Sequence, residues 1–130
     1  MLTLMHSARR FTDLSEQEIL ALAISAEEDD SRIYLTYAQK LQKDYPQSAN
    51  LFQDMAAEEE QHRQRLIELH KKRFGDVIPL IRREHVSGFY NRNPIWLVQN
   101  LGLERIRDEI ARMETDSHRF YQMAMRRATD

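Results

Sequence analysis

The sequence predicts an all-α fold, with long helices packed side by side as a bundle. Only three glycines and three prolines occur in 130 residues, and the residues that favour helices are abundant. Three segments place apolar residues at spacings of 3 and 4, the period of a helix with one buried face. We expect one domain over residues 15–130, preceded by a lead segment over residues 1–14.

The first helix is predicted over residues 15–43. Ser15 and Glu18 have the spacing of a capping box, in which each side chain accepts a hydrogen bond from the other residue's backbone. Leu14 and Ile19 flank this box at the spacing of a hydrophobic staple. These signals fix where the helix begins.

The second helix is predicted over residues 48–73. The Tyr45–Pro46 pair separates it from the first helix, because the residue before a proline disfavours helical backbone. Gly75 is the predicted C-terminal stop. Since only a few residues connect the two helices, they should form an antiparallel hairpin.

The helical pattern weakens over residues 75–94, with room for a short helix over residues 76–86, and a third helix is predicted over residues 95–128. The weak segment is long enough to cross the bundle from one end to the other. No fourth helix follows before Asp130. We therefore expect either a bundle truncated before its fourth helix or one that a partner chain completes.

A carboxylate and an imidazole interrupt the apolar face of the second helix. Glu59 and His62 lie three residues apart, so both side chains share one helix face. Their stripe is Leu51, Met55, Glu59, His62, Leu66 and Leu69. Burying an unpaired carboxylate is costly, and a bound metal ion would satisfy both groups. The competing interpretation is a solvated acidic face with a histidine that has an ordinary partner.

Acidic residues interrupt the other two helices in the same way. Glu27 and Glu114 each precede a tyrosine by seven residues, so Glu27 shares a face with Tyr34 and Glu114 with Tyr121. The two stripes are Leu20, Ala23, Glu27, Asp30, Tyr34, Tyr37, Leu41 and Ile106, Ile110, Glu114, Ser117, Tyr121, Ala124. Three helices thus bring carboxylates to one level of the core, the pattern of di-iron carboxylate bundles.

Several neighbouring residues have two open interpretations. Asp30 is predicted to be an accessory ligand or a hydrogen-bond acceptor, and His118 a substitute ligand or, in preference, a surface residue. Tyr34 and Tyr121 are expected to donate hydrogen bonds to ligand carboxylates. Residues expected at the surface are Glu28, Asp29, Glu60, His6, His70 and His85, while Glu58 is expected either there or lining an access path for iron.

Composition excludes several classes of function. The net charge is −2 and no basic face stands apart from acidic neighbours, so no nucleic-acid site is expected. No apolar run reaches membrane-spanning length, and no signal peptide is recognisable. Without cysteine there are no disulfides or thiolate ligands. Oxygen and nitrogen ligands suit iron, with manganese or zinc as alternatives.

The chain resembles the rubrerythrin branch of the ferritin-like superfamily from Leu14 onward. The residues that carry this resemblance are Ala26–Glu27 with Tyr34, the run Ala57 to His62 followed by Arg65–Leu66, and Glu114 with Tyr121. It is most similar to the N-terminal domain of bacterial membrane-bound ferritins, which precedes a vacuolar-iron-transporter-like domain. The resemblance implies a di-iron site, reaction with oxygen or peroxide, and a role in iron export or detoxification.

The resemblance also implies roles for individual residues. Glu27 would be a terminal ligand and His62 the nitrogen ligand of the first iron, Glu59 would bridge both irons, and Glu114 would be a terminal ligand of the second. The second iron then lacks a histidine and a second bridging carboxylate. The full-length protein would lie at the cytoplasmic face of a bacterial membrane, and this chain alone would be soluble in the cytoplasm.

Two functions from different classes remain open. The first is an iron-binding domain that oxidises or senses ferrous iron, with ferroxidase or peroxidase-like activity as an expectation. The alternative is a non-catalytic helical module that dimerises, with its buried acids paired to arginine or lysine. A symmetric homodimer is expected in either case, because a three-helix chain leaves an apolar face to cover.

Overall fold

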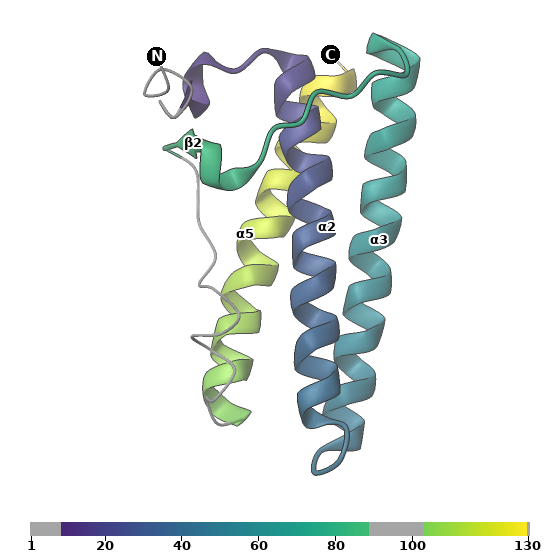
Figure 1. Cartoon of the computed structure of the whole chain (residues 1–130), viewed down its shortest axis with the longest axis vertical. Helices are drawn as coiled ribbons and strands as arrows, with labels where there is room; N and C mark the ends of the chain where they lie inside the picture. The colour runs from purple at the N-terminus through teal and green to yellow at the C-terminus, as the bar shows by residue number, and fades with distance from the viewer. Residues whose placement is uncertain (1–8, 89–102, 130) are drawn as a thin grey trace.

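The computed structural model describes residues 9–88 and 103–129, which form three long α-helices. These are α2 (Glu16–Leu41), α3 (Pro46–Phe74) and α5 (Leu103–Thr129) (Figure 1). The other regular elements of the described residues are β1 (Arg9–Arg10), η1 (Phe11–Asp13), η2 (Arg83–His85) and β2 (Val86–Ser87). The all-α class is confirmed.

Helix α2 begins where its capping box predicts. The backbone N–H of Glu18 donates to Ser15 Oγ at 3.1 Å, and the backbone N–H of Ser15 donates to Glu18 Oε1 at 2.9 Å. Leu14 and Ile19 are both buried in the same apolar cluster. The helix ends at Leu41, two residues before the predicted end.

Helix α3 begins at Pro46, two residues before the predicted start. Proline suits the first helical position, because its missing N–H has no partner there anyway and its φ is already helical. The helix stops at Gly75, as predicted, with a φ of 95° and its N–H donating to Lys71 O at 3.1 Å.

The predicted phase of α3 is wrong at the start of the helix. Leu51 is 56% exposed, and the residues that face the core are Ala49, Phe52, Ala56, Glu59, Leu66 and His70. Each residue turns the helix by about 100°, so a shift of one position at the start places Phe52 inside and Leu51 outside. Glu59 belongs to both the predicted and the observed face.

The three helices do not simply alternate in direction. Helices α2 and α3 form the predicted antiparallel hairpin, while α5 runs parallel to α3 (Figure 1). The end of α3 and the start of α5 therefore lie at opposite ends of the bundle. The described part of the connection between them passes across the N-terminal part of α2. Within residues 76–86, where a short helix was predicted, the structure has the 3-10 helix η2 over Arg83–His85, and Val86 opens β2.

Strand β2 pairs with β1 in parallel, with Arg9 opposite Val86 and Arg10 opposite Ser87. This pairing joins the segment before α2 to the connection after α3, and no sequence pattern predicted it. The predicted start of the third helix at residue 95 lies outside the described residues.

Two apolar clusters fill the space between the helices. One includes Leu20, Leu22 and Ala23 of α2 with Phe120 and Ala124 of α5. The other combines mainly Ile33, Tyr34 and Tyr37 of α2, Phe52 and Ala56 of α3, and Ile106, Ile110 and Met113 of α5. Buried acidic residues lie between the two clusters, so the polar level that the sequence predicted interrupts the core.

Candidate metal centre

Glu27 of α2 and Glu59 and His62 of α3 come together between the two apolar clusters. One ligand atom of each lies within 4.8 Å of the others. His62 Nδ1 is 3.7 Å from Glu27 Oε2 and 4.0 Å from Glu59 Oε2. The hairpin geometry brings these residues together because α2 and α3 run antiparallel with their polar positions at the same height.

All three converging atoms lack an ordinary partner. Glu27 is 4% exposed and Glu59 is 3% exposed, and the atoms Glu27 Oε2, Glu59 Oε2 and His62 Nδ1 are buried without a hydrogen bond. Buried polar atoms are normally satisfied, since an unmet one costs free energy. A cation between the two carboxylates and the imidazole would satisfy all three atoms, so these residues fit a metal ion.

The surroundings change the acidity of Glu27. Burial raises the pKa of its carboxyl above the ordinary value of 4.5, the adjacent His62 lowers it, and the negative charges of Asp30 and Glu114 raise it. The site therefore brings several carboxylates close to one imidazole, and this excess of acidic groups favours binding of a divalent cation.

The rubrerythrin family profile matches residues 18–130. The chain belongs to the rubrerythrin family. No curated protein matches it, and neither does any solved structure. Family membership implies iron binding, and the grouped carboxylates and histidine of this rubrerythrin domain are of the type that such a site needs.

Glu114 lies beside this group in the rubrerythrin domain without joining it. Its Oε1 accepts a hydrogen bond of 3.0 Å from the hydroxyl of Tyr34, which is fully buried. Its charge still acts on Glu27. The ligand role of Glu114 stays a prediction, and so does the role of Tyr34 in orienting a ligand.

Tyr121 contacts the site through its ring. The rings of Tyr121 and His62 stack with centroids 4.2 Å apart and planes 18° from parallel. A hydrogen bond from the Tyr121 hydroxyl to a ligand carboxylate was expected, and a stacking contact on the imidazole is found. The stack fixes the plane of the His62 ring, which sets the direction in which Nδ1 points.

Of the two predicted accessory ligands, Asp30 is buried and His118 is exposed. Asp30 accepts hydrogen bonds from Arg83 Nη1, at 3.0 Å, and from the Ser117 hydroxyl. This is the acceptor role that the sequence left open for it. Neither residue belongs to the described group of ligand atoms, and their ligand roles stay predictions.

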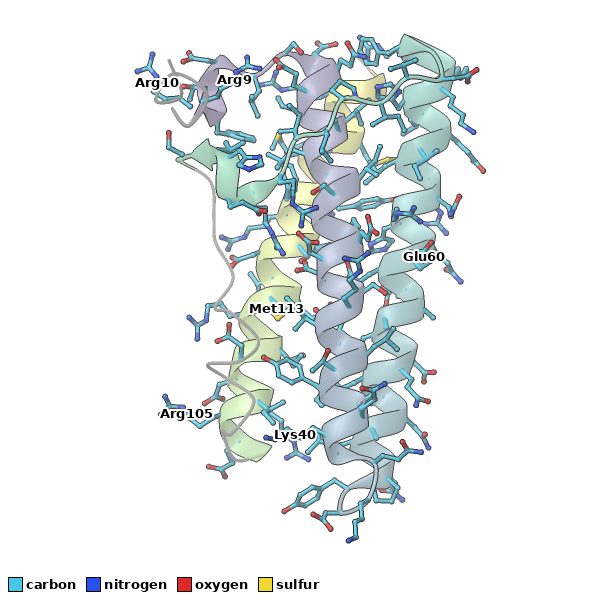
Figure 2. All side chains as sticks on the ribbon, viewed as in Figure 1. Arg9, Arg10, Lys40, Glu60, Arg105 and Met113 are labelled. Carbon is cyan, nitrogen blue, oxygen red and sulfur yellow. The ribbon has the colours of Figure 1, made fainter. Side chains whose placement is uncertain are left out.

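The glutamates that flank Glu59 differ from it in exposure. The Glu60 side chain leaves α3 on the side away from α2 (Figure 2) and forms a salt bridge with Arg63. Glu58 is exposed, and its Oε1 is 3.8 Å from His62 Nε2. His62 thus faces the buried acids with one ring nitrogen and a surface acid with the other.

The prediction that His70 lies at the surface is wrong. It is fully buried, with Nδ1 3.0 Å from the carbonyl oxygen of Gly75 and Nε2 3.4 Å from Gln17 Nε2. His70 follows Leu66 by four residues, so both lie on the buried face of α3. His85 is exposed, as expected, and His6 lies outside the described residues.

Among the described residues, none of the helices is long and apolar enough to cross a membrane.

Asp29, which was expected in solvent, is partly buried and forms ion pairs with Arg82 and Arg83 of the connection. Both arginines come from a segment whose placement on α2 the sequence did not predict.

Proposed function

We propose that this domain binds ferrous iron between α2 and α3 at a di-iron site, and that the iron is oxidised there by oxygen or peroxide. The observation that carries the proposal is the convergence of three buried ligand atoms without hydrogen bonds. Membership of the rubrerythrin family supports iron as the metal.

The residues of this chain would have distinct roles. Glu27, Glu59 and His62 would hold the first metal, with Glu59 bridging to a second that Glu114 would contact. When bound, two ferrous ions would supply the two electrons that, together with two protons, convert one hydrogen peroxide to two waters. The carboxylates offset the metal charge, Tyr121 orients the His62 ring, and the two apolar clusters keep bulk water away.

The alternative, a non-catalytic dimerisation module with paired acids, has less support. In that case the buried acids should face arginine or lysine. Glu27 and Glu59 face His62 instead, whereas Asp30 is paired with Arg83 of the same chain.

We also propose that two copies associate around this site. Three protein ligands leave coordination positions that a second chain can fill, and Leu35, Tyr45 and Leu51 expose apolar surface. Sedimentation at micromolar concentration tests this proposal, and a monomer that binds two irons per chain would overturn it.

A role in iron export or detoxification, as the cytoplasmic part of a membrane-bound ferritin, is a proposal that rests on the resemblance alone. Separation of cell extracts into membrane and soluble fractions, with an antibody against this domain, tests that location. Recovery of the domain in the soluble fraction alone would contradict it.

Ferrous iron added anaerobically, followed by exposure to air, tests the central proposal. Binding is measured by calorimetry, and oxidation by the ultraviolet charge-transfer absorbance of ferric iron. Glu59→Gln and His62→Ala should each bind iron at least tenfold more weakly, by analogy with the loss of a metal-ligand interaction. Glu60→Gln and Glu28→Gln, at partly exposed positions, are matched controls and should bind like the parent. Equal binding by all four variants would overturn the proposal.

A further inference from the structure

A buried junction of Asp30, Arg83 and Ser117 joins three elements one helical turn from the candidate metal centre. Asp30 lies three residues after Glu27 on α2 and is 1% exposed. Arg83 of η2 donates from Nη1 to Asp30 Oδ1 at 3.0 Å, and Ser117 of α5 donates to Asp30 Oδ2. One carboxylate therefore holds both the connection and α5 against α2.

This junction belongs to a series of contacts that fixes how α5 lies along α2. Tyr34 contacts Glu114, and Asp30 contacts Ser117. The contacting positions move forward along α2 and backward along α5 in steps of three or four residues, as antiparallel helices require. Glu114 lies one helical turn from Ser117 on α5, and Glu27 lies one turn from Asp30 on α2. A shift of α5 at Ser117 would therefore also move Glu114.

Arg83 stabilises the charge on which this junction depends. Its side chain is 7% exposed, and it offsets a carboxylate that is almost completely buried. A buried charge that loses its partner no longer keeps its geometry, because it must move towards water or take up a proton. Without Arg83, Asp30 would therefore no longer be held in place to accept from Ser117.

We propose that Arg83 is a positioning residue for the metal centre. It holds Asp30, Asp30 holds Ser117, and Ser117 sets the position of α5 at which Glu114 reaches the site. This inference rests on the proposed function and adds a residue outside all three helices to the machinery that prepares the site.

Arg82 provides a matched control one position away. Its side chain is 37% exposed, and its partners are Glu84 and Asp29, at 2.7 Å and 3.4 Å. Both arginines thus form ion pairs with α2, but Arg83 reaches the buried Asp30 whereas Arg82 is partly exposed and reaches Asp29. Arg82→Met should leave the junction intact.

Cobalt(II) titration tests the inference, because its visible absorption reports both affinity and coordination. Arg83→Met should weaken binding by about tenfold, the lower end of the loss expected when a residue that positions a metal ligand is replaced, and should change the absorption spectrum. Arg82→Met should match the parent in both. In a Glu114→Gln background, Arg83→Met should cause no further loss, since it acts through Glu114.

Each outcome separates this inference from the proposed function. If the parent binds cobalt and Glu59→Gln does not, the proposed metal centre is supported. The positioning role would then be overturned, with the metal centre still supported, by either of two results. Arg83→Met could bind cobalt like the parent, or it could weaken binding equally in the parent and in the Glu114→Gln background. Should Arg83→Met lose its helix content by circular dichroism, Ser117→Ala replaces it, because that change removes the α5 side of the junction and keeps the ion pair. The same tenfold loss and the same dependence on Glu114 are expected of Ser117→Ala, and their absence would overturn the inference.

Discussion

Glu27 illustrates how one buried carboxyl links pH to stability. Burial raises its pKa above 4.5, so the folded protein binds this proton more tightly than the unfolded chain does. Stability from this group is therefore present at low pH and is lost as pH rises from about 4.5 through the raised pKa of the folded state. Asp29, whose pKa burial also raises, contributes in the same direction.

In metal-free protein, Glu27→Gln should flatten the pH dependence of the melting temperature. Glutamine keeps the shape of the side chain and removes the titrating proton. Melting curves are recorded in chelator at several pH values from 4.5 to 8, and the difference between parent and variant isolates Glu27 from Asp29. A difference that stays constant over this range would show that Glu27 has an ordinary pKa.

At the scale of single residues, the sequence located Glu27, Glu59 and His62 because each interrupts an apolar stripe. The structure brings these three together, whereas their role as ligands stays a prediction. His70 was placed at the surface because the sequence shows no partner for it at metal-ligand spacing, whereas its partners in the structure are Gly75 and Gln17. The Arg83 partner of Asp30 was not predictable, since it comes from a segment without periodicity.

Helix α3 is followed by Gly75, whose backbone conformation is one that other residues rarely adopt. Gly75 has φ 95° and ψ −172°, a region almost reserved for glycine. A Cβ added there would meet nothing within 4 Å, so a substitution costs backbone strain and not a clash.

Gly75→Ala should therefore lower the free energy of unfolding by about 1–3 kcal/mol. Urea denaturation followed by circular dichroism measures this loss, with exposed Gln61→Ala as a control for adding alanine. Iron binding should be preserved at temperatures where the variant is folded, because Gly75 lies more than three turns beyond His62. An unchanged unfolding midpoint would show that the chain relaxes to a normal φ at this position.

At the scale of elements, helix starts and stops followed from local chemistry. Ser15, Pro46 and Gly75 each act through their own backbone or a neighbour three residues away, so their effect is visible in the sequence. The parallel pairing of β1 with β2 joins residues far apart in the chain. Two-residue strands have no period to detect, and their pairing depends on where the connection lies.

For the whole molecule, the unequal packing of the helices predicts unequal protection. Helix α2 packs more extensively on α3 than on α5, and α5 has little contact with α3. Amide hydrogens of α5 should exchange through an opening that leaves the α2–α3 hairpin folded. Native-state hydrogen exchange with increasing denaturant measures this, and Arg83→Met should speed exchange in α5 more than in the hairpin. Uniform exchange across all three helices would contradict this prediction.

All three grouped ligand residues precede Gly75, while α5 begins 28 residues after it. Contacts within a hairpin are close in sequence and form quickly, whereas the return of α5 must close a long loop. During synthesis, the carboxylates and imidazole can therefore meet once the first two helices have left the ribosome. A metal ion bound at that stage would be held before α5 has been synthesised. The order of translation would then favour metal binding during synthesis over replacement of the metal in the finished domain.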